Sequence, residues 1–281
     1  MGLGLIYKNE QHVLEENENN GVPYLTYPLL SETGVVLHAF TTRLGGVSTG
    51  YCATMNLSTT RGDDPEAVKE NTRRIAAAIG VEPGNMVYTH QTHTTNVAIV
   101  EEKDKGSHFD ETDGLITNVP GICLVTFYAD CVPLYFVDPV KKVIALSHSG
   151  WKGTVGKMGK VTVEKMTRYF DCDPADIVAA IGPSICADCY EVSEDVIDAF
   201  RASFDESLWS RLFYQKADQK GTDKYQLSLW NANEEVLKEA GITPDHIAVT
   251  NLCTHCNPDL LFSHRTTGNK RGNLSALLAL K

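Results

Sequence analysis

Two short apolar runs joined by a turn constrain the fold of this chain more than any other feature. Residues 134–137 and 143–146 are rich in strand formers, and residues 138–141 between them include a proline at a favoured turn position. We predict a β-hairpin with 138–141 as its loop. Counting outward places Cys131 opposite His148 on one face, with Cβ atoms about 5 Å apart. A one-residue slip would place the two side chains on opposite faces.

The rest of the sequence predicts short strands with single helices between them. Asp64 and Pro65 begin a helix that ends at Gly80, and Thr154 is the predicted N-cap of a helix over about 155–170. Further strands are predicted at 35–42, 94–101, 114–117, 121–127, 176–181, 247–250 and 274–280, and further helices at 193–204 and 229–240. This pattern favours mixed sheets covered by helices in one domain, 1–281, with 1–24 as an extended N-terminal segment.

Composition excludes several classes of partner. The net charge of −11 disfavours nucleic acid and anionic membranes, and no apolar run approaches the roughly 20 residues that span a bilayer. The start of the chain does not resemble a signal peptide. We therefore expect a cytoplasmic protein whose eight cysteines are thiols or metal ligands and not disulfides.

Cys131 and His148 suit two kinds of chemistry. With His93 as a third donor they would bind zinc and leave a fourth position open, as in catalytic zinc sites. Without metal, Cys131 would be a nucleophile and His148 its base. Asp130 is poorly placed to orient His148, because it is next to Cys131 and neighbouring strand residues point to opposite faces. A structural interpretation is equally open, since cysteine and histidine are also common core residues.

Two further cysteine motifs form a second candidate site. Cys186 and Cys189 make one CxxC unit, and Cys253 and Cys256 make another. Together they would form a Cys₄ zinc site, although a compact zinc ribbon has a much shorter separation between its units. The alternative is a set of loop cysteines without metal.

Arginines next to glycines are candidate phosphate ligands. Arg43, Arg61, Arg265 and Arg271 all lie close to glycine in the sequence, and arginine binds phosphate bidentately. Any one of them also suits a solvated surface. The sequence contains no Walker A motif or dinucleotide fingerprint, so we expect no bound nucleotide cofactor.

A series of motifs in order along the chain resembles one family. The sequence from about residue 25 to the C-terminus is similar to the YfiH/YlmD family, also called laccase-domain or polyphenol-oxidase-like proteins. The resemblance rests on Thr41-Thr42-Arg43-Leu44-Gly45-Gly46-Val47-Ser48, Asn56-Leu57-Ser58, Gln91-Thr92-His93, Asp113-Gly114, Ala129-Asp130-Cys131-Val132-Pro133, His148-Ser149-Gly150-Trp151-Lys152-Gly153, Ile181-Gly182-Pro183-Ser184-Ile185, Tyr190-Glu191-Val192 and Phe262-Ser263-His264-Arg265.

The resemblance implies both a fold and an activity. The fold would be an α+β layered sandwich related to the catalytic domain of cytotoxic necrotizing factor. His93, Cys131 and His148 would hold zinc. The activity would be phosphorolysis of adenosine, inosine and methylthioadenosine, together with deamination of adenosine. Purine nucleoside and phosphate would then be the small-molecule partners. We expect the substrate contacts to come from four residues: Arg43, Asn56, Gln91 and Arg265.

Other activities stay open at this stage. An older family label is copper-dependent polyphenol oxidase, and a His₂Cys site can bind copper. A true multicopper laccase needs many histidines, whereas this chain has nine and no His-x-His unit. A metal-free Cys–His hydrolase or deamidase and a non-catalytic binding protein are the remaining alternatives.

Overall fold

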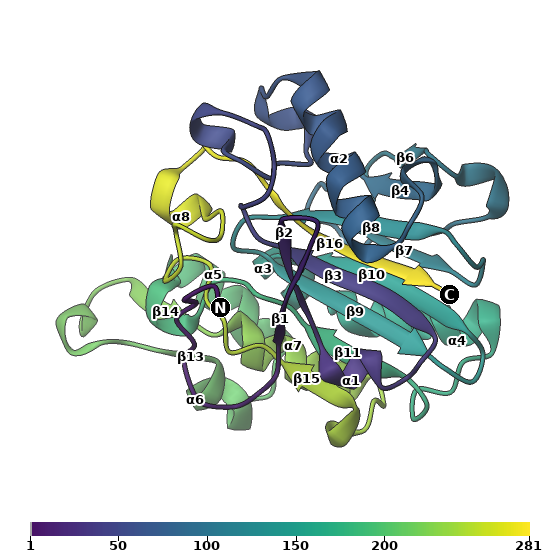
Figure 1. Cartoon of the computed structure of the whole chain (residues 1–281). Helices are drawn as coiled ribbons and strands as arrows, with labels where there is room; N and C mark the ends of the chain where they lie inside the picture. The colour runs from purple at the N-terminus through teal and green to yellow at the C-terminus, as the bar shows by residue number, and fades with distance from the viewer. Residues whose placement is uncertain (1) are drawn as a thin grey trace.

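The computed structural model describes residues 2–281, and its elements form layers (Figure 1). Helix α2 (Pro65–Ile79) covers one face of a seven-stranded sheet, whose other face packs on a six-stranded sheet. Helices α4 (Met158–Phe170) and α7 (Leu229–Glu239) cover the outer face of the second sheet. The predicted sandwich of mixed sheets covered by helices is confirmed.

The strand order brings distant parts of the chain together. The larger sheet runs β1 (Glu15–Asn19), β2 (Val22–Thr26), β3 (Val36–Thr41), β16 (Leu274–Leu280), β8 (Cys123–Tyr128), β4 (Met86–Thr89) and β6 (His108–Phe109). The second runs β15 (Ile247–Val249), β11 (Val178–Ile181), β9 (Val132–Asp138), β10 (Val143–Ser149), β7 (Gly114–Thr117) and β5 (Val97–Ile99). A small third sheet runs β12 (Glu191–Ser193), β14 (Lys224–Leu227) and β13 (Phe213–Tyr214). The other helices are α1 (Pro28–Ser31), α3 (Trp151–Val155), α5 (Glu194–Ser203), α6 (Trp209–Leu212) and α8 (His264–Thr267).

Strand β9 is buried on both faces, which explains its continuous apolar sequence. Leu134 and Phe136 point into the core that the helices cover, whereas Tyr135 and Val137 point into the core between the two sheets. The alternation follows from the two-residue period of a strand. The central strands therefore form a rigid support for the loops at their ends.

The β9–β10 hairpin forms as predicted, but its register differs by two residues. Val137 lies opposite Ile144, and Pro133 lies opposite His148. The carboxylate of Asp138 accepts the backbone N–H groups of Val140 and Lys141, at 2.9 and 2.8 Å, so Asp138 ends the strand and the loop is 139–142. An even shift keeps every side chain on its face. Cys131 is therefore a diagonal neighbour of His148 and not its direct partner.

The helix ends were predicted with mixed success. Asp64 caps α2 by accepting the backbone N–H of Glu66 at 3.1 Å, and Gly80 ends the helix with a φ of 80°, both as predicted. The helix predicted over 155–170 is confirmed for 158–170, but Thr154 is not its N-cap. The segment forms α3 and then α4, and Thr154 lies inside α3, where its hydroxyl donates to the carbonyl of Gly150 at 3.0 Å.

The N-terminal segment is more regular than the predicted extended start. β1 and β2 form an antiparallel hairpin whose turn is Asn20-Gly21, with φ angles of 52° and 74°. Asn-Gly favours this type of two-residue turn. Charged side chains on β1 suit an edge strand. Among residues 2–281, no helix has both the length and the apolar character needed to cross a bilayer.

Candidate active site

The three predicted metal ligands lie together at one edge of the sheets. The donor atoms of His93, Cys131 and His148 lie within 4.8 Å of one another. Sγ of Cys131 lies 4.0 Å from Nε2 of His93. The ring centroids of His93 and His148 are 4.9 Å apart, and the two rings are nearly perpendicular. Tetrahedral zinc with these ligands would hold sulfur and nitrogen about 3.5 Å apart. The donor types and spacing therefore fit a zinc ion.

Strand pairing explains why these segments meet. β4 and β8 pair in parallel, so both strands end at the same edge of the larger sheet. The loop after β4 carries His93, and the turn after β8 carries Cys131. His148 lies on β10 of the facing sheet. Side chains of β10 and β8 pack together in the core between the two sheets. The site thus forms where the two sheets and two loops converge.

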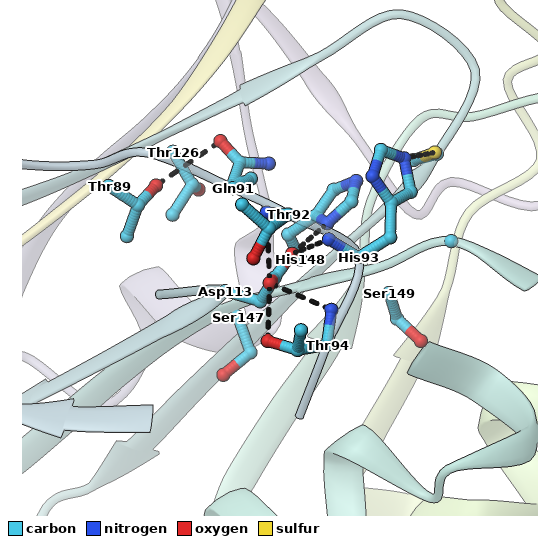
Figure 2. A network of polar contacts seen from close by, with 12 residues as sticks. Thr89, Gln91, Thr92, His93, Thr94, Asp113, Thr126, Ser147, His148 and Ser149 are labelled. Atoms are coloured by element: carbon cyan, nitrogen blue, oxygen red, sulfur yellow. Dashed lines mark hydrogen bonds and ion pairs between the residues drawn. The ribbon is translucent and has the colours of Figure 1, made fainter. Parts of the chain in front are cut away.

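Asp113 fixes the positions of both histidines (Figure 2). Its buried carboxylate accepts the backbone N–H groups of Thr92, His93 and Thr94 at 3.1, 3.0 and 2.9 Å. It also lies 2.8 Å from Nδ1 of His148. These contacts hold His93 in a left-handed backbone conformation with a φ of 61°. Asp113 was not among the predicted site residues, although Asp113-Gly114 is one of the family motifs.

The carboxylate also sets the tautomer of His148. With Nδ1–H donating to Asp113, Nε2 of His148 faces Cys131 as a donor for metal. Burial opposes ionisation of Asp113, but hydrogen bonds from His148 and Thr94 outweigh it and lower its pKa to about 2. Asp113 therefore stays charged and keeps the imidazole oriented.

Cys131 and His148 change each other's pKa, because their donor atoms lie within 4.8 Å. Burial raises the pKa of the Cys131 thiol, but His148 and His93 outweigh this effect and lower it to about 6. Burial lowers the pKa of His148, but Cys131 and Asp113 outweigh it and raise the value to about 9. At neutral pH the sulfur is then a thiolate, which is the form that binds metal or acts as a nucleophile.

The three donors open into a cavity of about 1070 Å³. Its wall includes Tyr88, whose ring stacks on His108 at 4.7 Å and on Phe127 at 6.2 Å. Arg61 and Arg271 also line it. A cavity of this size with aromatic and cationic walls accommodates a small molecule larger than an amino acid.

The arginine pair has unused hydrogen-bonding capacity. The Nε atoms of Arg61 and Arg271 are buried and find no hydrogen-bond partner within residues 2–281. Burial, followed by the charge of Arg61, lowers the pKa of Arg271 to about 10. Two neighbouring guanidinium groups that form no ion pair with a carboxylate in the described part of the chain are candidates to bind an anion.

The predicted substrate contacts are distributed differently around this cavity. Gln91 lines it, but its amide is bonded to both backbone groups of Phe127 at 2.8 Å. Asn56 is fully buried, and its side-chain Oδ1 accepts a hydrogen bond from the backbone N–H of Asn273 at 3.0 Å. Asn56 therefore lies behind the cavity wall and holds its backbone.

The two predicted arginine contacts lie outside the residues that line the cavity. The guanidinium of Arg43 donates to the carbonyls of Ala53 and Pro258, at 3.0 and 2.6 Å. Arg265 donates to the carbonyl of Glu191 at 2.9 Å and lies over the ring of Tyr190. Arg61 and Arg271, which do line the cavity, were candidate phosphate ligands but not among the four predicted substrate contacts.

Comparison with known proteins identifies the family. A family model described as multi-copper polyphenol oxidoreductase laccase matches residues 37–281. The chain belongs to this family. The resemblance inferred from the sequence motifs is thereby confirmed.

Several members of this laccase-like family have names that indicate purine nucleoside chemistry. The chain is 36% identical to purine nucleoside phosphorylase YlmD of Bacillus subtilis over 256 residues, which cover 88% of this chain and 89% of that protein. It is 34% identical to adenosine deaminase RL5 of an unknown prokaryotic organism over 245 residues, covering 84% and 91%. The crystal structure of YlmD from Geobacillus stearothermophilus matches with a TM-score of 0.88 and 31% identity, covering 96% of this chain and 99% of that chain.

Proposed function

We propose that this protein is a purine nucleoside phosphorylase that also deaminates adenosine, with His93, Cys131 and His148 holding zinc. Adenosine, inosine and methylthioadenosine are the proposed nucleosides, and phosphate is the second substrate. One observation carries the proposal: a single cavity joins the three candidate metal donors to an aromatic wall and to two neighbouring arginines, Arg61 and Arg271. The relatives named as phosphorylases and as a deaminase support the same chemistry.

Arg61 and Arg271 are the proposed phosphate ligands. Both side chains line the cavity, and their two positive charges favour a tetrahedral anion inside it. In phosphorolysis, the bond from the anomeric carbon of ribose to the purine breaks as a phosphate oxygen bonds to that carbon. The arginines hold phosphate for this attack, and Gln91 contributes by fixing the cavity wall.

As the purine leaves, a group in the site has to neutralise the negative charge that develops on it. Stacking near Tyr88 and His108 would place the purine beside the His93–Cys131–His148 end of the cavity. Zinc held there supplies Lewis-acid chemistry for the purine or for water. Asp113 keeps His148 oriented throughout. We propose zinc as the metal, with copper as the alternative that the family description suggests.

A specific observation favours a second candidate, a metal-free cysteine hydrolase or deamidase. Cys131, His148 and Asp113 form a nucleophile, base and orienting carboxylate, and the pKa of the thiol is lowered to about 6. Asp130 does not contribute, because its carboxylate binds Thr254 at 2.6 Å. The polyphenol oxidase alternative has weaker support, because the other candidate metal group among residues 2–281 contains four cysteines and no histidine.

Product analysis tests the proposal directly. Protein with a measured zinc content is incubated with adenosine, with and without phosphate, and the products are separated. Adenine and ribose 1-phosphate should form only with phosphate, whereas inosine should form in both conditions. Absence of both products would falsify the proposal.

Metal removal separates the two mechanisms. A chelator-treated protein should lose activity and regain it with zinc. Full activity without metal would instead favour Cys131 as a nucleophile. Cys131→Ala should abolish turnover in both cases, so it serves as the background control.

A further inference from the structure

Four cysteines outside the active site converge on one point. The Sγ atoms of Cys186, Cys189, Cys253 and Cys256 all lie within 4.8 Å of one another, and Cys189 and Cys256 are 3.6 Å apart. A tetrahedral zinc ion with Zn–S bonds of about 2.3 Å holds its sulfurs about 3.8 Å apart. The spacing therefore matches a tetrathiolate site.

The fold explains how two units so distant in sequence meet. β11 and β15 pair in parallel and end at the same edge of the six-stranded sheet. The chain continues side by side after both strands, since Ser184 and Cys253 form a parallel bridge. The first CxxC unit follows this bridge by two residues and the second begins at it, so both units reach the same place.

The local backbone is arranged for thiolate ligands. The N–H of Cys186 donates to Sγ of Cys253 at 3.2 Å, which stabilises negative charge on the sulfur. The N–H of Cys189 donates to the carbonyl of Cys186 at 3.1 Å, closing a tight turn that brings both thiols to one side. Cys186 and Cys253 are buried, and Cys189 and Cys256 are half-buried.

Neighbouring polar side chains are already engaged elsewhere. The carboxylate of Asp188, inside the first unit, binds Lys8 and Tyr214 at 2.9 and 2.7 Å. His255, inside the second unit, has Nδ1 2.9 Å from the hydroxyl of Thr266. The four sulfurs are therefore the donor set.

We propose that Cys186, Cys189, Cys253 and Cys256 bind a second metal ion, a structural zinc separate from the His93–Cys131–His148 site. Four protein ligands leave no open position, which is typical of structural zinc. Two disulfides are a poorer match, because each would draw one pair together to about 2.05 Å, whereas here all four sulfurs approach one centre.

The second metal would also support the active-site turn. The two loops that carry the cysteines bind Asp130, the residue before Cys131. Ile185 donates its N–H to the carbonyl of Asp130 at 3.1 Å, and Thr254 donates its hydroxyl to the carboxylate at 2.6 Å. Tying these loops together therefore restrains the turn on which Cys131 lies.

Counting zinc per folded chain by native mass spectrometry tests this proposal. The wild-type protein, expressed with zinc, should carry two ions. Combining His93→Ala with Cys131→Ala should leave one, and combining Cys186→Ser with Cys189→Ser should also leave one. The four substitutions together should leave none. Cys52→Ser changes a buried thiol outside the cluster and should retain two ions.

Cobalt gives a second readout that does not depend on the serine variants folding. Co²⁺ bound to the His93→Ala, Cys131→Ala protein should show intense thiolate-to-metal charge transfer and tetrahedral d–d bands. Absence of this spectrum would overturn the proposal. The proposal would also fail if the wild-type protein held one zinc and the His93→Ala, Cys131→Ala variant held none. A disulfide between Cys189 and Cys256 in the native protein would likewise contradict it.

Discussion

The carboxylate of Asp113 lies 2.8 Å from Nδ1 of His148 and also accepts the backbone N–H of His93 at 3.0 Å. One buried charge thus positions two candidate metal ligands from different parts of the chain. Carboxylates in this position orient the imidazole and raise its basicity toward metal. The geometry of the site therefore depends on a residue outside the set of candidate ligands.

Replacing Asp113 with asparagine should weaken zinc binding by about 10- to 100-fold. The amide removes the charge and turns an N–H₂ group toward N–H donors, so His93 and His148 lose their common anchor. Competition with a chromophoric chelator measures the affinity. Asp110→Asn, an exposed carboxylate in the same region, is the matched control and should bind zinc normally. Equal affinity in both variants would contradict the role of Asp113.

Gly150 leaves room for the site. A Cβ atom there would lie 3.1 Å from both Sγ of Cys131 and Cδ2 of His93. Its φ of −74° suits any residue, so Gly150→Ala adds a steric contact without backbone strain. Overpacking of about 1–3 kcal/mol should lower zinc affinity by about 5- to 150-fold. Isothermal titration checks this, with Gly84→Ala, which meets nothing within 4 Å, as the control.

The central hairpin shows what local sequence can predict. Apolar runs placed β9 and β10 correctly, but the register depended on the side chain of Asp138 bonding into its own loop. Because the error was two residues, Cys131 and His148 stayed on one face. An error of one residue would have separated them.

Long-range relationships were harder to predict. The position of His93 depends on hydrogen bonds to Asp113, and the meeting of Cys186 with Cys253 depends on the parallel pairing of β11 with β15. Neither contact leaves a periodic signal in the chain. Similarly, Arg43 and Arg61 look alike in sequence, yet Arg43 donates to two carbonyls and Arg61 faces the cavity.

Arg61 and Arg271 should control phosphate binding. Changing either to glutamine removes a charged donor worth about 1.5–3 kcal/mol, so KM for phosphate should rise about 10- to 100-fold. KM for adenosine and the rate of inosine formation should change little, because deamination uses no phosphate. Steady-state kinetics with varied phosphate measures the effect. Arg168→Gln, an arginine that lies over the ring of Tyr169 and outside the residues lining the cavity, should leave both constants unchanged.

His38 should make stability depend on acid. Its buried Nε2 accepts the N–H of Tyr27 at 2.8 Å, and burial lowers its pKa from 6.5 to about 4. Between these two values the unfolded chain binds a proton that the folded protein does not, so stability falls as pH falls from 6.5 and this loss levels off near 4. The whole change amounts to about 3 kcal/mol.

Replacing His38 with glutamine removes the titrating group while its amide oxygen can still accept the N–H of Tyr27. Urea unfolding at several pH values should then give a shallower loss of stability between pH 6.5 and 4 than in the wild type. His12→Gln, on the surface, should keep the wild-type slope because that side chain is exposed. An identical slope in His38→Gln and wild type would show that other groups cause the acid sensitivity. A shallower slope in the buried variant alone would assign it to the imidazole between Tyr27 and Tyr135, whose ring centroids lie 6.0 and 6.5 Å away.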